Sequence, residues 1–480
     1  MDVLDVLDEL KRALDPDSVL EGEQVSLRSN GWGRRDACRA RAVVRPRDTE
    51  AVSTVLRLCH AAGQPIVLHG GMTGLVGGAV ARPEEIALSL ERMTAIEEVD
   101  PVGRTMTVQA GVTLERIQRA AEEAGCLFPL DLGARGSCTI GGNVATNAGG
   151  NHVLRYGMTR AQVLGLEAVL ADGTVIDDLR KMLKNNAGYD LKQLFIGSEG
   201  TLGVVTRVVL RLRARPRSEN TALVAVDSFE GITRLLTASE EHLGGDLTAF
   251  EVMWEDFYRT TTTEPARNRP PLPYGHPYYV IVEMLGSHPE SDAARFEGLL
   301  AEAVEEGIAA DAVLAGSRSE RRAIWAIRDD VEQLGRHAPI FTFDVSVPIA
   351  RMESYVDELR TGLAAEFPDR ELHCIVFGHL GDGNLHPTVA VGESGPEVRR
   401  RVEARVYGPL RERGGSVSAE HGIGLEKQPY LSWSRGPAEI EMMRTLKRAL
   451  DPKGILNPGR VIPSTLAETH ARPASSPGRW

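Results

Sequence analysis

The sequence of 480 residues lacks a long apolar run, a paired-cysteine motif and an excess of positive charge. Without an apolar stretch long enough to cross a bilayer, no integral membrane segment is expected. The five cysteines form no Cys-x-x-Cys pair, and their odd number favours free thiols in a reducing compartment. The net charge of −12 argues against nucleic acid or an anionic membrane surface as the main partner. Since the acidic N-terminus has no features of a secretory signal or transit peptide, a cytoplasmic enzyme is expected.

The chain is too long for one hydrophobic core, so two or three domains are expected. Residues 213–220 are charged, contain Pro216 and predict a domain boundary. Beyond the boundary, two strand–helix–strand patterns predict a split βαβ layer of ferredoxin-like type. Residues 164–176 predict a hairpin with an Asp-Gly turn, and residues 465–480 predict a disordered tail.

Two glycine-rich stretches precede this boundary. A predicted strand over residues 65–68 leads into residues 70–78, where glycines let backbone N–H groups approach a pyrophosphate. That loop has neither Gly-Lys-Ser/Thr nor Gly-x-Gly-x-x-Gly, and a plain bend remains the alternative. Residues 129–150 are rich in Gly, Ser, Thr and Asn with almost no charge, which favours backbone lying against a large flat ligand. A flexible loop is the alternative for the second stretch.

Histidines and a carboxylate recur in two short glycine-flanked segments. We interpret His379, His386 and Glu420 as ligands of a divalent metal, since two imidazoles and a carboxylate leave positions open for a substrate oxygen. His421 is then the base beside the metal. The alternative is a glycine turn that carries solvated histidines.

Several long segments, in order from about residue 40 to 462, resemble the FAD-dependent D-2-hydroxyacid dehydrogenases of the vanillyl-alcohol-oxidase superfamily. The branch is that of the D-2-hydroxyglutarate and D-lactate dehydrogenases. The matching segments are residues 70–74, 129–150, 188–203, 378–386, 418–424 and 450–459.

The resemblance implies an α+β fold. A two-lobed FAD-binding domain of vanillyl-alcohol-oxidase (PCMH) type would be joined to a ferredoxin-like antiparallel cap domain. The expected organisation is an N-terminal helical segment (1–40), the FAD-binding domain (41–215), the substrate or cap domain with the metal site (216–425), a C-terminal segment returning to the FAD domain (426–464) and the tail (465–480).

The resemblance also implies roles for individual residues. Arg328 would grip the substrate carboxylate, Asn384 would contact the substrate and His421 would be the catalytic base. His379, His386 and Glu420 would hold the metal, which is zinc, with manganese or iron as alternatives. The expected FAD contacts are His69, Gly70, Gly71, Met72, Thr73, Gly74, Leu75, Pro129, Leu132, Gly133, Ser137, Ile140, Gly141, Gly142, Asn143, Ala145, Thr146, Asn147, Gly149, Glu199, Gly200, Leu202, Val204, Val205 and Asn457.

The implied reaction transfers hydride from C2 of a D-2-hydroxy acid to the flavin while His421 takes the hydroxyl proton. Enzymes for 2-hydroxyglutarate have a Thr four positions after the Arg and a Lys before the Tyr/Phe-Asp pair of the next strand. Glu332 and Thr342 occupy these places here. A second substrate carboxylate would lose a cation and meet an anion, so we expect a hydroxy acid with a neutral or cationic side chain.

Met72 stands where some members of the superfamily attach FAD through a His, so dissociable FAD is predicted, although His69 lies nearby. Relatives pass electrons to an electron-transfer flavoprotein, a quinone or a cytochrome, and a homodimer is a further expectation. The competing functions are an oxidase or non-redox flavoenzyme of the same fold, a non-catalytic flavin-binding module, and a metal-only hydrolase or oxygenase.

Overall fold

The computed structural model describes residues 5–32 and 36–463. The chain forms two compact units. Unit 1 comprises the residues up to Gly149, Gly157–Arg215 and the segment that starts at Glu420; unit 2 comprises Gly150–Tyr156 and Pro216–Ala419. The tail predicted for residues 465–480 lies outside the described residues.

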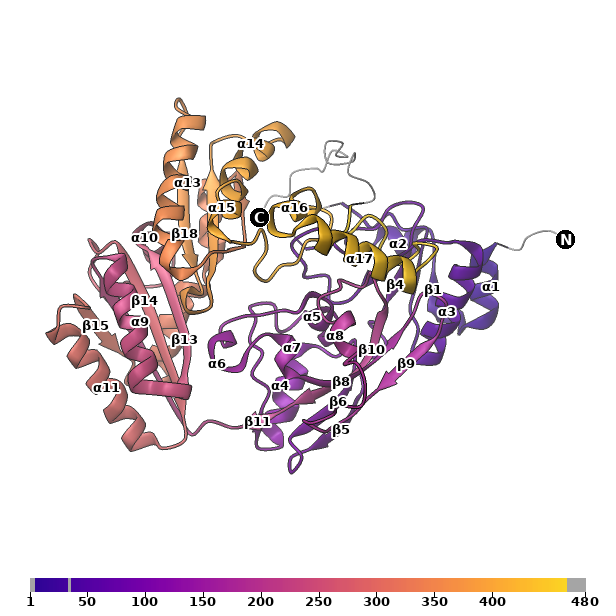
Figure 1. Cartoon of the computed structure of the whole chain (residues 1–480), viewed down its shortest axis with the longest axis horizontal. Helices are drawn as coiled ribbons and strands as arrows, with labels where there is room; N and C mark the ends of the chain where they lie inside the picture. The colour runs from indigo at the N-terminus through magenta and orange to yellow at the C-terminus, as the bar shows by residue number, and fades with distance from the viewer. Residues whose placement is uncertain (1–4, 33–35, 464–480) are drawn as a thin grey trace. The chain divides into compact units, whose positions relative to one another are not determined.

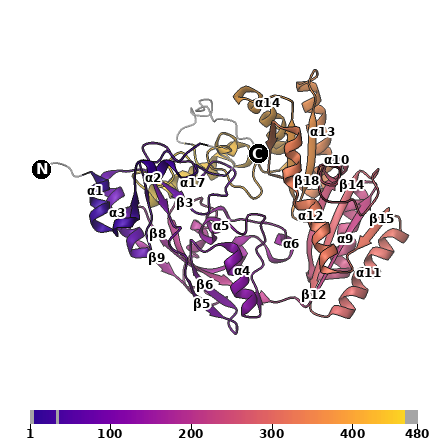
Figure 2. The ribbon, with the colours of Figure 1, turned by 180° about the vertical axis from the view of Figure 1, so that it is seen from behind.

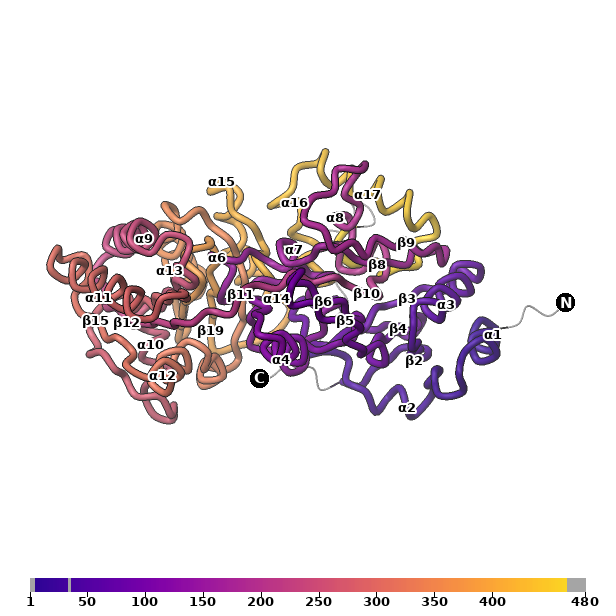
Figure 3. Tube along the Cα trace, turned by 90° about the horizontal axis from the view of Figure 1, so that it is seen from below, coloured from indigo at the N-terminus to yellow at the C-terminus, as the bar shows by residue number. Residues whose placement is uncertain are grey.

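Unit 1 contains two main sheets, and Figure 3 labels most of their strands along the trace. The first has the order β1 (Val19–Leu20), β2 (Ala42–Val44), β4 (Ile86–Ser89), β3 (Ile66–His69), and both pairings of β4 are parallel. The second is antiparallel with the order β5 (Ile96–Asp100), β6 (Thr105–Gln109), β10 (Val204–Arg211), β8 (Val163–Val169), β9 (Val175–Asp178). A short pair joins β7 (Cys126–Leu127) to β11 (Arg213–Ala214).

The helices of unit 1 follow local capping signals. Helix α3 (Thr49–Ala62) begins where the Asp48 side chain accepts a hydrogen bond from the Ala51 N–H, and it ends at Gly63 in the left-handed region. Residues 5–32 are not one helix, because β1 separates α1 from α2 and pairs with β2. The helices are α1 (Val6–Ala13), α2 (Glu23–Ser26), α4 (Leu114–Glu123), α5 (Ile140–Thr146), α7 (Thr159–Gln162), α8 (Lys192–Phe195), α16 (Leu431–Ser434) and α17 (Pro437–Leu450).

Unit 2 is built on an antiparallel sheet with the order β15-β12-β14-β13-β18-β19-β16, and β17 pairs with β19 (Figure 1). Its first four strands form the split βαβ arrangement predicted from the sequence, with the units β12-α9-β13 and β14-α11-β15. The strands are β12 (Ser218–Val226), β13 (Leu247–Trp254), β14 (Tyr278–Gly286), β15 (Asp311–Leu314), β16 (Ile340–Thr342), β17 (Val345–Ser346), β18 (His373–Gly378) and β19 (Asn384–Ala390).

Helices cover both faces of this sheet. Helices α9 (Phe229–Leu243) and α11 (Pro289–Glu305) pack together, while α10 (Glu255–Thr262) and α12 (Arg318–Asp329) pack together over a second apolar cluster that includes Tyr279 and Ile281 (Figure 2). Alternate residues of a strand face opposite sides, so Glu251 of β13 lies on the same face as Met253 of that cluster. The other helices are α6 (Val153–Tyr156), α13 (Met352–Glu366), α14 (Pro396–Tyr407) and α15 (Leu410–Arg413).

All five cysteines are buried free thiols, which agrees with their predicted use as small apolar side chains. Among the described helices, none combines the length and the apolar character needed to cross a membrane.

Candidate functional site

The first glycine loop of unit 1 follows β3 and lies directly against the second glycine-rich stretch. A Cβ atom added to Gly71 would come within 2.2 Å of the Ser137 carbonyl oxygen, so only glycine allows this approach. Within the described chain, no residue accepts a hydrogen bond from the backbone N–H groups of residues 70–75. The loop therefore presents a run of free donors of the kind that binds phosphate oxygens.

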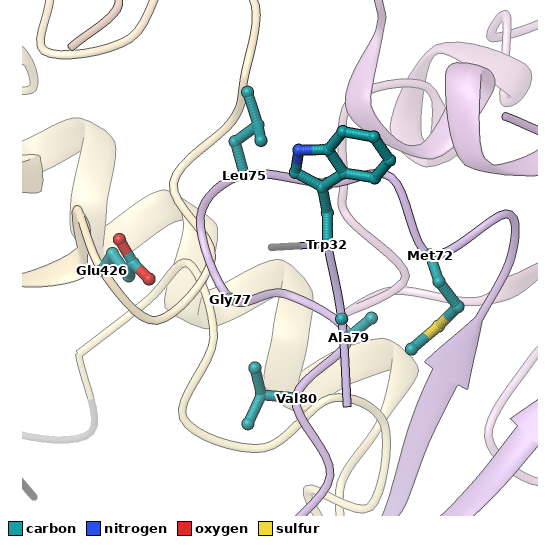
Figure 4. Close-up of a pocket in the computed structure, with 9 residues that line it drawn as sticks. Trp32, Met72, Leu75, Gly77, Ala79, Val80 and Glu426 are labelled. Carbon is teal, nitrogen blue, oxygen red and sulfur yellow. The ribbon is translucent and has the colours of Figure 1, made fainter. Parts of the chain in front are cut away.

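The same loop lines a pocket in unit 1. Figure 4 shows the side chains of Trp32, Met72 and Leu75 around it. The full lining consists of Gly31, Trp32, Met72, Gly74, Leu75, Gly77, Ala79, Val80 and Glu426. Nothing lies within 4 Å of a Cβ atom placed on Gly74, so the backbone is open to the pocket there.

His69 is buried at the end of β3, and its Nε2 atom lies 2.9 Å from the Ala79 carbonyl oxygen. Burial lowers the pKa of His69 to about 4 despite that hydrogen bond, so the ring is neutral at pH 7. A neutral imidazole whose Nε2–H donates to a carbonyl serves the packing of the loop.

The second glycine-rich stretch runs into α5. A Cβ atom on Gly141 would lie 2.7 Å from that of Ala110, so glycine is again required by close packing. The Thr139 hydroxyl oxygen is buried and has no hydrogen-bond partner among the described residues. The side chains of Thr146 and Asn147 are engaged locally, with the Gly142 carbonyl and the Arg160 N–H respectively.

Glu199 and Asn457 use their side chains within unit 1. The Glu199 carboxylate accepts hydrogen bonds from the N–H groups of Ile423 (2.7 Å) and Gly424 (2.8 Å). Burial raises the pKa of Glu199, and these N–H groups only partly offset that effect. The Asn457 amide donates to the Glu199 carbonyl and accepts from the Leu68 N–H. Both residues therefore tie β3 and the segment after Glu420 together.

The other predicted cofactor contacts differ in their burial. Ile140, Leu202 and Val205 belong to one apolar cluster of unit 1, and Val204 belongs to another. Gly133 and Ser137 are exposed, whereas Gly149 is buried. Pro129, Leu132, Gly142 and Ala145 belong to the second glycine-rich stretch, whereas Gly200 packs closely against Leu68 of β3.

In unit 2, the predicted residues His379 and Arg328 form one buried hydrogen-bonded group with Glu251, which was not predicted from the sequence. His379 follows β18, Arg328 lies in the last turn of α12, and Glu251 lies in β13. His379 Nδ1 is 2.7 Å from Glu251 Oε1, and Arg328 Nε donates to Glu251 Oε2 at 2.9 Å. Arg328 Nη2 lies 3.2 Å from His379 Nε2. Burial alone would raise the pKa of Glu251, but His379 and Arg328 outweigh it and lower the pKa.

The tight β18–β19 turn brings His379 and His386 together, with ring centroids 5.4 Å apart. Glu420 and His421 belong to unit 1, whereas His379, His386 and Asp344 belong to unit 2. Imidazole and carboxylate groups are the ligand types that a divalent transition metal binds.

Asn384 begins β19 and is 3% exposed. Neither its amide nitrogen nor its amide oxygen has a hydrogen-bond partner among the described residues. Leaving a buried amide unpaired costs about 1–3 kcal/mol. Such an amide points to a ligand that completes its hydrogen bonds.

Two family models together match most of the chain. The family described as "FAD binding domain" matches residues 40–178, and "FAD linked oxidases, C-terminal domain" matches residues 215–461. The chain is 39% identical to mitochondrial D-2-hydroxyglutarate dehydrogenase of Rattus norvegicus, over 93% of this chain and 82% of that protein. The chain belongs to the FAD-linked oxidase family. It is also 38% identical to a putative mitochondrial D-lactate dehydrogenase of Schizosaccharomyces pombe, over 90% of this chain and 83% of that protein.

The fold of this FAD-linked oxidase is also that of p-cresol methylhydroxylase with bound substrate. The TM-score is 0.75 at 16% identity, over 95% of this chain and 96% of that one. The predicted α+β fold class is therefore confirmed, as is FAD as the cofactor of the matched domain. The free N–H groups of residues 70–75 and the unpartnered Thr139 hydroxyl fit a dinucleotide with a pyrophosphate.

Sequence reasoning missed Glu251 and Asp344. Each is a buried carboxylate, Glu251 within the largely apolar strand β13 and Asp344 between β16 and β17, and a carboxylate beside apolar residues was the signal available. Asp344 accepts hydrogen bonds from the Ser418 hydroxyl and the Ala419 N–H, both at 3.1 Å.

Proposed function

We propose that the protein is a dehydrogenase that oxidises a D-2-hydroxy acid to the 2-oxo acid, with FAD as hydride acceptor. The observation that carries the proposal is the buried group of Arg328, His379 and Glu251 beside His386. It combines a carboxylate-binding guanidinium with an imidazole suited to metal binding.

The Nη1 group of Arg328 is available to donate a hydrogen bond to the substrate. Nε is used by Glu251 and Nη2 by His379, whereas Nη1 has no acceptor among the residues that the structure describes. The Arg328 guanidinium also lies 4.8 Å from the centroid of the Phe377 ring, which limits its orientations. A substrate carboxylate at Nη1 would therefore meet a fixed cation.

Asn384 would supply the second polar contact. Its amide is buried and unpartnered, so a substrate oxygen and a donor would each satisfy one end of it. His421 would accept the hydroxyl proton, since an imidazole is the usual base at neutral pH. FAD, when bound, takes the hydride from C2.

A divalent metal would be held by His379, His386 and Glu420, with zinc as the first choice and manganese or iron as alternatives. Such an ion lowers the pKa of a bound hydroxyl group. Since His379 Nε2 faces Arg328 Nη2, coordination through Nε2 requires that hydrogen bond to open.

The substrate that we propose is not 2-hydroxyglutarate, although relatives carry that name. Glu332 and Thr342 are exposed and stand where 2-hydroxyglutarate enzymes have a Thr and a Lys. An anion in place of a cation disfavours a second carboxylate. A D-2-hydroxy acid with a neutral or cationic side chain fits better.

Electrons would pass to an acceptor other than oxygen, such as an electron-transfer flavoprotein, a quinone or a cytochrome. Assembly as a homodimer and a cytoplasmic location are further proposals from the sequence.

Anaerobic mixing with a panel of D-2-hydroxy acids tests the proposed function. We expect a D-2-hydroxy acid to bleach the flavin absorbance of the purified protein, and its L-isomer to leave it unchanged. Turnover should continue with an artificial dye as acceptor and with little oxygen consumption. Fast oxygen consumption would indicate an oxidase, and no bleaching by any acid of the panel would refute the dehydrogenase.

Chelation tests the metal. Prolonged dialysis against a chelator should abolish bleaching while the protein remains yellow, and added zinc, manganese or iron should restore it. Full activity of protein shown by elemental analysis to be metal-free would contradict the proposed metal site.

A further inference from the structure

The carboxylate of Glu251 in β13 bonds to two side chains of the proposed site. These are His379, the proposed metal ligand, and Arg328, the proposed substrate-binding residue. Glu251 is 1% exposed, and each of its oxygens accepts one hydrogen bond, from His379 and from Arg328. Arg328 lies in α12 and His379 directly follows β18, so Glu251 links these two elements through its hydrogen bonds.

The hydrogen bond to His379 has a defined consequence for the ring. A carboxylate is only an acceptor, so Nδ1 of His379 carries the proton and Nε2 keeps its lone pair. The 3.2 Å approach of Arg328 Nη2 to Nε2 agrees, since a guanidinium is only a donor. Glu251 thus sets the tautomer that metal coordination through Nε2 needs.

The hydrogen bond to Arg328 acts on the substrate side. Holding Nε fixes the plane of the guanidinium and leaves Nη1 for a carboxylate. Because the buried charges of Glu251 and Arg328 offset one another, removal of the Glu251 charge would leave a buried cation.

We propose that Glu251 is a positioning residue that orients both the metal-binding imidazole and the substrate-binding guanidinium. This inference rests on the proposed roles of His379 and Arg328. It predicts that one substitution in β13 changes metal affinity and substrate KM together, without any contact between Glu251 and either ligand.

Glu251→Gln is the sharpest test because it keeps the size of the side chain. Glutamine has one acceptor oxygen and one NH2 donor. Its oxygen can accept the hydrogen bond from either His379 or Arg328, and its NH2 group then faces the donor of the other residue. We expect zinc to bind 10- to 100-fold more weakly, measured by competition with a chromogenic chelator. We expect the KM for the best D-2-hydroxy acid to rise at least about tenfold in zinc-saturated protein.

Glu283→Gln is the matched control. Glu283 lies in β14 beside β13 and is also fully buried, and it accepts hydrogen bonds from Arg321 and Trp325 of the same helix α12. It holds the first turns of α12, and within the part of the chain that the structure describes no hydrogen bond joins it to His379 or Arg328. Its zinc affinity should therefore stay within about threefold of the wild type, even if the variant is less stable.

The outcomes separate the two proposals. If the wild-type protein binds no divalent metal, the proposed metal function fails. If it binds zinc and Glu251→Gln binds zinc equally well, or if Glu283→Gln weakens zinc as much, the positioning role of Glu251 is overturned. Should Glu251→Gln not fold, Glu251→Asp serves instead, because it keeps both acceptors but is one methylene shorter; wild-type zinc affinity and KM in that variant would overturn the role.

Discussion

At the scale of single residues, buried carboxylates with two or more donors hold the candidate site of unit 2. Glu251 accepts from His379 and Arg328, and Asp344 accepts from Ser418 and Ala419. An ionised carboxylate removed from water without such partners costs several kcal/mol. Each of these carboxylates therefore has specific hydrogen-bond donors. Replacing the carboxylate would leave those donors without an acceptor.

His69 makes stability depend on pH. Its pKa is about 4 in the folded protein and about 6.5 in the unfolded chain, so the unfolded state binds the additional proton between these values. The stabilisation is complete above pH 6.5 and is lost as the pH falls to 4, by about 3 kcal/mol.

We expect His69→Gln to reduce this loss of unfolding free energy between pH 7 and 4, as measured by urea unfolding. The exposed His242 provides a control, and His242→Gln should leave the slope unchanged. Equal pH slopes in the wild type and His69→Gln would contradict the prediction.

The substrate side chain is tested at two exposed residues. Glu332→Thr combined with Thr342→Lys removes an anion and supplies a cation, so kcat/KM for D-2-hydroxyglutarate should rise at least about tenfold. The kcat/KM for D-lactate, which has no second carboxylate, should change little. An unchanged preference between the two acids in steady-state assays would argue against our assignment of the substrate.

The residues that sequence reasoning found and missed differ in a physical way. His379, His386 and Glu420 were predicted because ligand types gather in short glycine-flanked segments. Glu251 contacts partners 77 and 128 positions away, so no local pattern reveals it. In the same way, the engagement of the Glu199 side chain by Ile423 depends on a contact across 224 positions.

At the scale of elements, two glycines allow the β18–β19 turn that brings the histidines together. A Cβ atom on Gly378 would lie 2.3 Å from the Asn384 carbonyl oxygen, and Gly383 has φ +88°. His379 and His386 can therefore face one another although seven positions separate them. The fold-back of this segment was predicted from the sequence.

The segment that contains Glu420 and His421 is held at both of its ends. Before it, Ser418 and Ala419 donate to Asp344. After it, Ile423 and Gly424 donate to Glu199, which itself has φ +50°. Such paired anchors restrict the backbone of the two residues between them.

Gly422→Ala tests this restraint. The residue has φ +83°, and an added Cβ atom would lie 2.8 Å from Glu199 Oε1. We expect a loss of about 1–3 kcal/mol in unfolding free energy and at least about a tenfold fall in kcat, because His421 is displaced.

Gly63→Ala is the control for Gly422→Ala. Gly63 has φ +66° but no atom within 4 Å of its added Cβ, so it shares the backbone strain without the clash. Its kcat should be normal. A similar fall in kcat in both variants would mean that the anchor at Glu199 has no specific role.

The sequence also predicted elements where local chemistry determines them. The Asp172-Gly173 turn joins β8 and β9 as expected, with Gly173 at φ +89°. The split βαβ layer follows from alternating strand and helix patterns. The sheet order in unit 1 was not predictable, because parallel partners such as β3 and β4 are set by contacts distant in sequence.

At the scale of the whole molecule, unit 1 gathers both glycine-rich stretches and the segment from Glu420, whereas residues 150–156 group with unit 2 through contacts such as α6 on β13. These memberships depend on tertiary contacts. The predicted boundary at residue 216 coincides with the division between Arg215 and Pro216, whereas the later division lies between Ala419 and Glu420 and not at residue 425.

FAD should bind reversibly, because Met72 occupies the position of a flavin-linking His and His69 donates through Nε2 to Ala79. Acid denaturation should release all of the flavin into the supernatant. The melting temperature of the apoprotein should rise with added FAD. At an FAD concentration of a hundred times the Kd, the free energy of unfolding should increase by about 2.7 kcal/mol. Flavin that remains with the precipitated chain would instead demonstrate a covalent link.

The shared carboxylate of Glu251 constrains anyone who would redesign this catalyst. Exchanging Arg328 for an apolar side chain, to admit alcohols without an acid group, would also strip one oxygen of Glu251 of its donor and loosen the imidazole on the other. A change of substrate would therefore require a compensating substitution in β13, so substrate specificity and metal affinity would have to be engineered together.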